Sequence, residues 1–352
     1  MIDTIIFDMD GVITTEEKYW ACARLTLWEF ITQTLALPDA FPNAVLDADA
    51  RQIVIPDDLI YALKGRAVNS NWDVTFVLVC AWLAALPGAR AFSAHTPQAL
   101  IDTLQTQAQA AAFLPEWPHT GYDLLAQTPL EGLPLVEFAG SWAALALGTS
   151  GLMEPEGAFW RYLQERFQRF YMGEVLRAYG GAALRDGTAL PVEALQQTLQ
   201  ALRNMNITLG VATGRPLDEL HDALDSLDLM RYFDGARLGT YDKVIAAQHE
   251  TSITGLAKPH PYSLLYALYP SLSPRDLLAP DLLKNARPNV AVIGDAPGDM
   301  QMAKAAGCHA IGVLTGVQGD AAKAERREKL ISAGAETILP DMTFLPEYFK
   351  NL

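Results

Sequence analysis

The sequence predicts an α/β protein in which a parallel sheet is interrupted by a long, mainly helical insertion. The segment Ile2–Phe7 is an apolar run rich in β-branched residues, as expected of a buried strand. From about Pro191 onward, short apolar strands alternate with helical patterns, which indicates βαβ units. The stretch between about Thr15 and Gly181 is rich in Ala, Leu and Trp and predicts only helices and loops. The first strand cannot pair inside such a helical segment, so it belongs with the later strands.

The first strand runs directly into Asp8-Met9-Asp10-Gly11. Acids at the carboxyl edge of a parallel sheet lie where open α/β folds bind their ligands. Asp8 and Asp10 would share a face of a regular strand, and a turn near Gly11 can bring both into one cavity. One carboxylate could then attack a substrate while the other transfers a proton. On this segment alone, a strand-end turn with solvated acids is an equally good interpretation.

The insertion has helical periodicity at Tyr19–Leu35 and again at Phe159–Ala178. The longest nearly apolar run, Val74–Leu86, is too short to span a membrane and predicts a buried helix. The stretch from Thr128 to Pro134 is expected to be a loop inside the insertion. The predicted hinges of the insertion are Thr14-Thr15 and Gly180-Gly181.

Later strands are predicted at Ile207–Ala212, Val290–Gly294 and Ala310–Leu314. The first of these is followed by Thr213-Gly214-Arg215-Pro216, which opens a helix with acids in its first turn. Free backbone N–H groups, the threonine hydroxyl and a helix N-terminus together could form an anion site. An ordinary strand-to-helix turn explains the same residues about as well.

Two further segments place charged residues at the ends of elements. Lys258 precedes Pro259 at a helix start, where a cation is unusual unless it meets a carboxylate or a phosphate, although a solvated lysine is also reasonable. Asp295 and Asp299 follow the strand that ends at Gly294. Four carboxylates converging beside a phosphate site would repel one another, which implies a divalent cation. Oxygen ligands and a phosphate-bearing partner favour Mg²⁺.

Composition narrows the classes of partner. A formal charge of -15 and a pI near 4.8 argue against nucleic-acid and anionic-membrane partners, which require a basic face. Three scattered cysteines without a CxxC pair predict a reducing, cytoplasmic location rather than a disulfide framework. The first residues carry no basic region typical of a secretory signal, and the six histidines have no metal-binding spacing.

In this order, the segments resemble the four motifs of the haloacid dehalogenase superfamily: Asp8-Met9-Asp10-Gly11-Val12, Thr213-Gly214-Arg215, Lys258-Pro259, and Gly294-Asp295-Ala296-Pro297-Gly298-Asp299. The resemblance implies a Rossmann-like catalytic core of residues 1–14 and 182–352. It also implies an α-helical cap of residues 15–181, inserted after the first motif and longer than is usual for such caps. Caps of this kind close over the site and exclude water.

The resemblance also implies roles for individual residues. Asp8 would be the nucleophile that accepts a phosphoryl group, and Asp10 would be the acid that protonates the leaving oxygen and later activates water. Thr213 and Lys258 would hold the phosphoryl oxygens, and the neighbouring Gly214 and Arg215 are expected on the substrate side. The Mg²⁺ ligands would be Asp8, Asp10 through its backbone carbonyl, and Asp295, with Asp299 positioning the metal shell.

The expected function is a Mg²⁺-dependent phosphatase that hydrolyses a small phosphorylated metabolite through a phosphoaspartate. Asp10 argues against a dehalogenase, which has no leaving alkoxide to protonate. A phosphonatase would need an amine from the insertion, for which Lys18 and Lys64 are available. A phosphoglucomutase-like enzyme is a further alternative, because the linker after Asp10 is similar, although those enzymes carry a histidine near Trp20. The alternative outside enzymes is a receiver-like signalling or binding protein phosphorylated on aspartate.

Within the insertion, the segment from Lys64 to Asp73 is the densest polar cluster. Arg66, Asn69 and Asn71 are expected to face the substrate from this cluster. A solvated loop between helices is at least as good an interpretation of the same residues.

Overall fold

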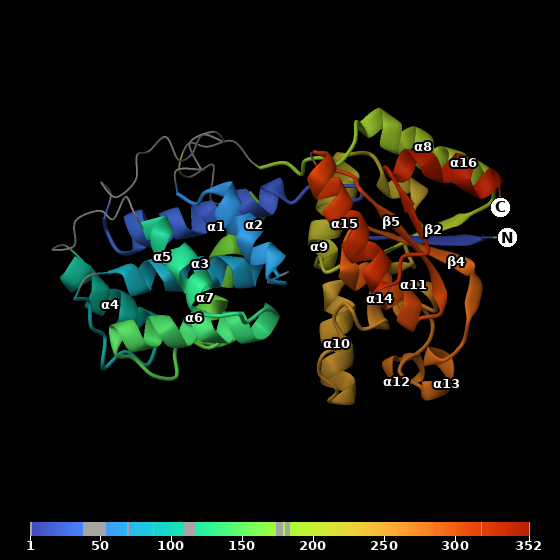
Figure 1. Ribbon diagram of the computed structural model, residues 1–352. Coiled ribbons are helices and arrows are strands. Elements are labelled where there is room, and N and C mark those ends of the chain that lie inside the picture. Colours follow the sequence, from blue (N-terminus) through green and yellow to red (C-terminus); the bar gives the residue numbers. More distant parts are fainter. Residues whose placement is uncertain are drawn as a thin grey trace. The chain divides into compact units, whose positions relative to one another are not determined.

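The chain is described by a computed structural model that covers residues 2–37, 54–68, 70–86, 88–108, 117–173, 179, 184–317 and 319–351. It divides into two compact units. The first unit combines Met1–Glu16 with Asp186–Leu352, and the second unit is Glu17–Arg185. The first unit contains the sheet, and the second is built from helices (Figure 1).

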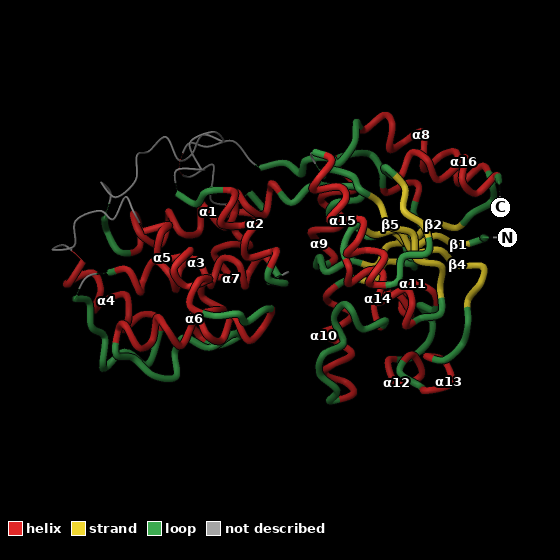
Figure 2. Tube along the Cα trace, in the orientation of Figure 1, coloured by secondary structure: helices red, strands yellow, loops and turns green. Residues whose placement is uncertain are grey.

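The sheet of the first unit has six parallel strands in the order β3-β2-β1-β4-β5-β6 (Figure 2). Its strands are β1 (Thr4–Phe7), β2 (Thr208–Ala212), β3 (Leu238–Gly239), β4 (Arg287–Gly294), β5 (Cys308–Val313) and β6 (Thr337–Leu339). The strand nearest the N-terminus therefore lies in the middle of the sheet, between β2 and β4, which both follow it only after the helical unit.

The register of the central strands aligns their carboxyl ends. Phe7 is paired with Val211 of β2 and with Ile293 of β4. Asp8, which follows Phe7, is thus level with the last residues of both neighbouring strands, Ala212 and Gly294. Because all three strands are parallel, the polar residues that follow them emerge at one edge of the sheet.

Alternate residues of β1 enter different cores, as the period of a strand requires. Ile5 and Phe7 pack in one core, and Ile6 packs in the other. The core of Ile5 and Phe7 includes residues of α8 (Val192–Asn204), α9 (Leu217–Ser226), η6 (Met230–Tyr232), η7 (Met342–Phe344) and α16 (Leu345–Lys350). The core of Ile6 includes residues of α10 (Tyr241–Thr251), α11 (Tyr262–Leu268), α12 (Pro274–Leu277), α14 (Pro297–Ala305) and α15 (Asp320–Ala333), with α13 (Pro280–Leu283) packed against it. Helices thus cover both faces of the sheet.

All regular secondary structure among the described residues of the second unit is helical. Its elements are α1 (Glu17–Glu29), η1 (Phe30–Thr34), α2 (Asp57–Gly65), α3 (Asn71–Ala85), α4 (Pro97–Ala108), α5 (Trp117–Gln127), α6 (Gly132–Leu147) and α7 (Ala158–Tyr171). They share one hydrophobic core, in which α3 is buried over most of its length. Among the described helices, none is by itself long and apolar enough to cross a membrane; one sharply bent pair, Pro118–Gln127 with Gly132–Leu147, passes that test by length and composition only.

The two chain segments that connect the units pair with each other inside the first unit. Thr14 and Thr188 form an antiparallel bridge. The N–H of Thr15 donates to the carbonyl of Gly187 at 2.9 Å, and the N–H of Ala189 donates to the carbonyl of Ile13 at 3.0 Å. The chain therefore leaves the α/β unit and returns to it side by side.

The predicted fold class, an α/β parallel sheet with a mostly helical insertion, is confirmed. The predicted helix Tyr19–Leu35 is present as α1, which continues into the π-helical turn η1. The predicted helix Phe159–Ala178 is present as α7 up to Tyr171, and residues 174–178 lie outside the described residues. The predicted hinge Gly180-Gly181 also lies outside them.

Candidate active site

Lys258 joins two carboxylates at the sheet edge. Its ammonium donates to Oδ1 of Asp8 at 2.7 Å and to Oδ1 of Asp299 at 2.7 Å. Asp299 lies in the first turn of α14, where its Oδ2 accepts the backbone N–H of Ala296 at 3.2 Å. Asp8 is held at the end of β1 because its own N–H donates to the carbonyl of Ile293 in β4. Three segments that are far apart in sequence thus meet at the ammonium group of Lys258.

The electrostatics of this group follow from burial and crowding of like charges. Burial raises the pKa of Asp8 well above its usual value, the charge of Asp299 raises it further, and Lys258 opposes both. Burial alone would lower the pKa of Lys258, but Asp299 and Asp8 outweigh it and raise the pKa above its ordinary value. Lys258 therefore keeps its proton between the two carboxylates.

Asp295 follows β4 and has a cationic partner of its own. Nη1 of Arg326, from α15, donates to the backbone carbonyl of Asp295 at 2.6 Å and to its Oδ2 at 2.9 Å. Burial raises the pKa of Asp295 to about 7; the charges of Asp299 and Glu16 add to the effect, and Arg326 opposes it. The pair holds the Asp295 carboxylate at the strand end.

Asp8, Asp295 and Asp299 form an acidic cluster. One carboxylate oxygen from each of these residues lies within 4.8 Å of the others. Three carboxylates in this cluster have only Lys258 and Arg326 as ion-pair partners among the described residues. A set of oxygen donors with excess negative charge fits a hard divalent cation such as Mg²⁺.

The carboxylate of Asp10 lies outside the acidic cluster and is bound by Arg215. Nε of Arg215 donates to Oδ2 of Asp10 at 3.1 Å, and Nη2 donates to Oδ1 at 2.6 Å. Nη1 of the same guanidinium donates to Oδ1 of Asp186 at 2.9 Å. A metal role for Asp10 is thus left to its backbone carbonyl. The resemblance places Arg215 on the substrate side; in the structure its side chain is 1% exposed, and its guanidinium contacts the carboxylates of Asp10 and Asp186.

The turn after β2 holds Thr213 rigidly. The N–H of Thr213 donates to the carbonyl of Gly239 at 2.9 Å, and its Oγ1 accepts the N–H of Arg215 at 3.2 Å. The space next to Gly214 is open, since a Cβ there would meet nothing within 4 Å. The helix start at Leu217, part of the predicted anion site, already donates its N–H to Oδ2 of Asp242. An anion at this turn would therefore be met by Thr213 and Gly214 rather than by the first N–H of α9.

Two glycines allow the close packing of the acidic cluster. A Cβ on Gly11, which has a φ of +79°, would lie 2.2 Å from Oδ2 of Asp295. A Cβ on Gly294 would lie 2.3 Å from the Cβ of Asp299. The sequence predicts a turn at Gly11 and a strand end at Gly294, but not their close approach to the acids. The sequence analysis also missed Asp186 and Arg326, for which the local sequence carries no signal.

Arg66, Asn69 and Asn71 are the residues of the insertion that are predicted to contact the substrate. Arg66 instead forms hydrogen bonds within the second unit. Its guanidinium donates to the backbone carbonyls of Thr128 (2.9 Å), Leu130 (3.3 Å) and Leu125 (3.2 Å). Asn71 is the first residue of α3. Asn69 lies outside the described residues. Arg66 therefore fastens the loop between α5 and α6.

The lysines considered for a phosphonatase also lie in the second unit. Lys18 is buried in α1, and its ammonium lies 3.7 Å from the centre of the Tyr171 ring. Lys64 lies in the last turn of α2. A buried ammonium on an aromatic face is stabilised by a cation–π interaction, which is a structural role.

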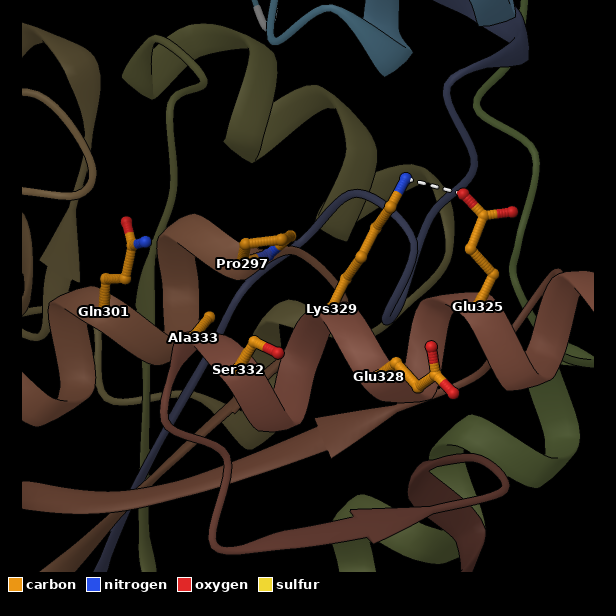
Figure 3. Close-up of a pocket in the computed structure, with 7 residues that line it drawn as sticks. All are labelled: Pro297, Gln301, Glu325, Glu328, Lys329, Ser332 and Ala333. Atoms are coloured by element: carbon orange, nitrogen blue, oxygen red, sulfur yellow. Dashed lines mark ion pairs between the residues drawn. The ribbon is translucent and has the colours of Figure 1, made fainter.

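A surface hollow lies between α14 and α15 (Figure 3). The ion pair between Lys329 and Glu325, at 2.8 Å, crosses part of its rim. The residues that line it are Pro297, Gln301, Glu325, Glu328, Lys329, Ser332 and Ala333. The lining includes neither Lys258 nor any member of the acidic cluster, so the hollow is not the candidate site.

Comparison with known proteins supplies the family. The chain matches the model of the haloacid dehalogenase-like hydrolases over residues 2–307. It is 29% identical to the phosphoglycolate phosphatase of Salmonella typhimurium over 181 residues, which are 51% of this chain and 58% of the relative. The Escherichia coli K12 phosphoglycolate phosphatase is also 29% identical, over 44% of this chain and 48% of its own length. The chain thus spans about half the length of the curated relatives it matches.

A solved structure shares the whole architecture. An X-ray structure from the Northeast Structural Genomics Consortium superposes with a TM-score of 0.75 over 99% of both chains, at 24% identity, and this likeness concerns the fold. The family match covers most of the chain, and it includes the β1 turn, Thr213, Lys258 and the acids after β4. The chain belongs to the haloacid dehalogenase-like hydrolases.

Proposed function

We propose that this chain is a Mg²⁺-dependent phosphatase that hydrolyses a small phosphorylated metabolite through a phosphoaspartate on Asp8. The observation that carries the proposal is the contact of Lys258 with both Asp8 and Asp299, beside Asp295, at one edge of the sheet. A carboxylate is a weak nucleophile, but phosphoryl transfer depends mainly on positioning and charge neutralisation. In this proposal Lys258 supplies positive charge, and Lys258 and Thr213 orient the phosphoryl oxygens.

The reaction has two steps. In the first, Oδ1 or Oδ2 of Asp8 forms a bond to phosphorus while the bond from phosphorus to the ester oxygen breaks, and protonated Asp10 gives its proton to that oxygen. The alcohol leaves, and Asp8 carries the phosphoryl group. In the second, Asp10 takes a proton from water as the water oxygen bonds to phosphorus and the bond to Asp8 breaks. Inorganic phosphate leaves, and both aspartates return to their starting forms.

We propose that the acidic cluster holds Mg²⁺, with Asp8 and Asp295 as carboxylate ligands, the backbone carbonyl of Asp10 as a third, and Asp299 orienting the shell. When bound, the ion would neutralise negative charge on the phosphoryl oxygens. The fit rests on three carboxylate oxygens within 4.8 Å of one another, which form a set of hard oxygen donors.

For the two units, we propose that Met1–Glu16 with Asp186–Leu352 is the catalytic core and that Glu17–Arg185 is the cap. The matched relatives are named phosphoglycolate phosphatases, so 2-phosphoglycolate is the first substrate to test. The cytoplasmic location remains a prediction.

The test is phosphate release from a broad panel of phosphorylated metabolites, including 2-phosphoglycolate, with and without Mg²⁺. Turnover that requires Mg²⁺ and is lost in Asp8→Asn would support the proposal. A stable phosphoaspartate with no phosphate release would favour the signalling alternative, and isomerisation of a sugar phosphate would favour the mutase.

A further inference from the structure

The Asp10–Arg215–Asp186 triad is a buried chain of charges that the motifs do not explain. One guanidinium contacts two carboxylates, Asp10 through Nε and Nη2 and Asp186 through Nη1. The side chain of Asp186 is 0% exposed and that of Arg215 is 1% exposed, whereas that of Asp10 is 24% exposed. Asp10 is thus the one member of the triad that can meet a substrate.

The triad fixes the orientation of the Asp10 carboxylate. Arg215 contacts both of its oxygens, and a planar fork of this kind prevents the carboxylate from turning. Oδ1 accepts two donors, Nη2 of Arg215 at 2.6 Å and the hydroxyl of Thr14 at 3.1 Å. Among the described residues, Oδ2 accepts only Nε of Arg215, at 3.1 Å. Oδ2 therefore has the lone pair that is available to bind a proton.

We propose that Arg215, anchored by Asp186, is a positioning residue that holds Asp10 so that its Oδ2 gives and takes the proton in the hydrolysis. The inference rests on the proposed function, in which Asp10 alternates between acid and carboxylate. It assigns to Arg215 a role in the proton transfer rather than in substrate binding.

Asp186 supplies a second counter-ion for Arg215. The guanidinium is buried, and a buried cation without a fixed counter-ion is costly. The Asp186 carboxylate is itself buried and accepts Nη1 of Arg215 at 2.9 Å. The hydroxyl of Thr14, which also accepts Nη2 of Arg215 at 2.8 Å, adds a third fixed contact. Arg215 is thus held in place by contacts with Asp186 and Thr14 that do not involve Asp10.

The test compares leaving groups in the full-length protein with Mg²⁺ present. 4-Nitrophenyl phosphate has a leaving group that departs without a proton, whereas an alkyl phosphate needs the acid. The readout is kcat/KM, which reports the steps up to loss of the leaving group. General acid catalysis contributes roughly 10²- to 10⁴-fold, so we expect Arg215→Lys to lower kcat/KM for the alkyl phosphate at least about tenfold more than for 4-nitrophenyl phosphate. Asp186→Asn, which keeps the shape but removes the charge, should give the same pattern more weakly.

The matched control is Arg287→Lys. Arg287 is another buried arginine of the same unit, bonded to backbone carbonyls such as those of Asn285 and Leu282. The Arg287→Lys variant should lower the melting temperature without changing the ratio of the kcat/KM values for the two substrates. If either Arg215→Lys or Asp186→Asn fails to fold, the ratio of the kcat/KM values for the two substrates can be measured on the other variant. Equal losses for both substrates would overturn the positioning role while leaving the proposed function intact. Absence of phosphate release by the wild-type protein would overturn both.

Discussion

The turn at Gly11 and the carboxylate of Asp295 are packed so closely that a methyl group does not fit between them. A Cβ on Gly11 would lie 2.2 Å from Oδ2 and 2.4 Å from Cγ of Asp295. The turn after β1 and the end of β4 thus approach through bare backbone. The position of the Asp295 side chain therefore depends on residue 11 having no Cβ.

Gly11→Ala is expected to destabilise the protein and to displace Asp295. The positive φ alone costs roughly 1–2 kcal/mol for a residue with a Cβ, and the clash adds to it. Phosphate release and the melting temperature should both fall. Gly298→Ala is the control, because a Cβ on Gly298 in the first turns of α14 would meet nothing within 4 Å. Full activity in Gly11→Ala would contradict the close packing of this turn.

Asp8→Asn is expected to lose essentially all phosphate release, because an amide cannot attack phosphorus and is a poor ligand for Mg²⁺. Its Oδ1 can still accept the bond from Lys258, so the fold should persist. The measurement is phosphate release together with the melting temperature of the variant. Retention of more than a small fraction of wild-type turnover would rule out Asp8 as the nucleophile.

Mg²⁺ is expected to raise the melting temperature with concentration, because it would bind the folded acidic cluster and not the unfolded chain. At a hundredfold excess over its Kd, the gain in unfolding free energy is about 2.7 kcal/mol. Asp295→Asn should remove most of the shift, whereas Asp281→Asn, an exposed acid of α13, should keep it. Calorimetry that detects no shift at millimolar Mg²⁺ would argue against a metal at this cluster.

Arg66→Ala is expected to act on stability rather than on specificity. Hydrogen bonds from a charged group are worth about 1.5–3 kcal/mol, and Arg66 donates to three backbone carbonyls. The melting temperature should fall, and kcat/KM for a large and a small substrate should change in equal proportion. Arg161→Ala, at an exposed arginine of α7, is the control. A selective loss of about tenfold for the larger substrate would instead restore the substrate-reading role that the sequence suggested.

His260 is expected to make the protein less stable as pH falls. Burial lowers the pKa of its imidazole, whose Nδ1 accepts the N–H of Tyr262 at 3.2 Å. Below the ordinary imidazole value of about 6.5, the unfolded chain takes up a proton that the folded protein resists, so the free energy of unfolding decreases. The His260→Asn side chain keeps a hydrogen-bond acceptor but does not titrate. The melting temperature of this variant should therefore depend less on pH between about pH 6.5 and 5. An unchanged slope would exclude this histidine as the cause.

The central strands and the residues that follow them were predictable because each strand is a continuous apolar run. Parallel pairing then places Asp8, Thr213 and Asp295 at one edge whatever the details of packing. The strands β3 and β6 were missed because they have two and three residues and owe their existence to pairing with a neighbour.

Long-range partners of the site residues were not predictable. Asp186 and Arg326 reach Arg215 and Asp295 from segments whose own sequence resembles an ordinary charged surface. The sequence predicts Arg215 on the substrate side, and only the fold reveals that its guanidinium contacts the carboxylates of Asp10 and Asp186. Sequence patterns thus locate the acids and bases, whereas their pairing depends on tertiary contacts.

The two segments that lead into and out of the helical unit, Ile13–Thr15 and Gly187–Ala189, pair with each other in antiparallel fashion. The helical unit is therefore an insertion at one point of the α/β unit. Every strand of the sheet finds its neighbours without using a residue from Glu17–Arg185. The two connecting segments meet at the bridge between Thr14 and Thr188. An inserted segment of a different length could therefore be joined at the same point without altering the strand order of the sheet. The acidic cluster and Lys258 thus keep their positions in the sheet whatever the length of the inserted segment.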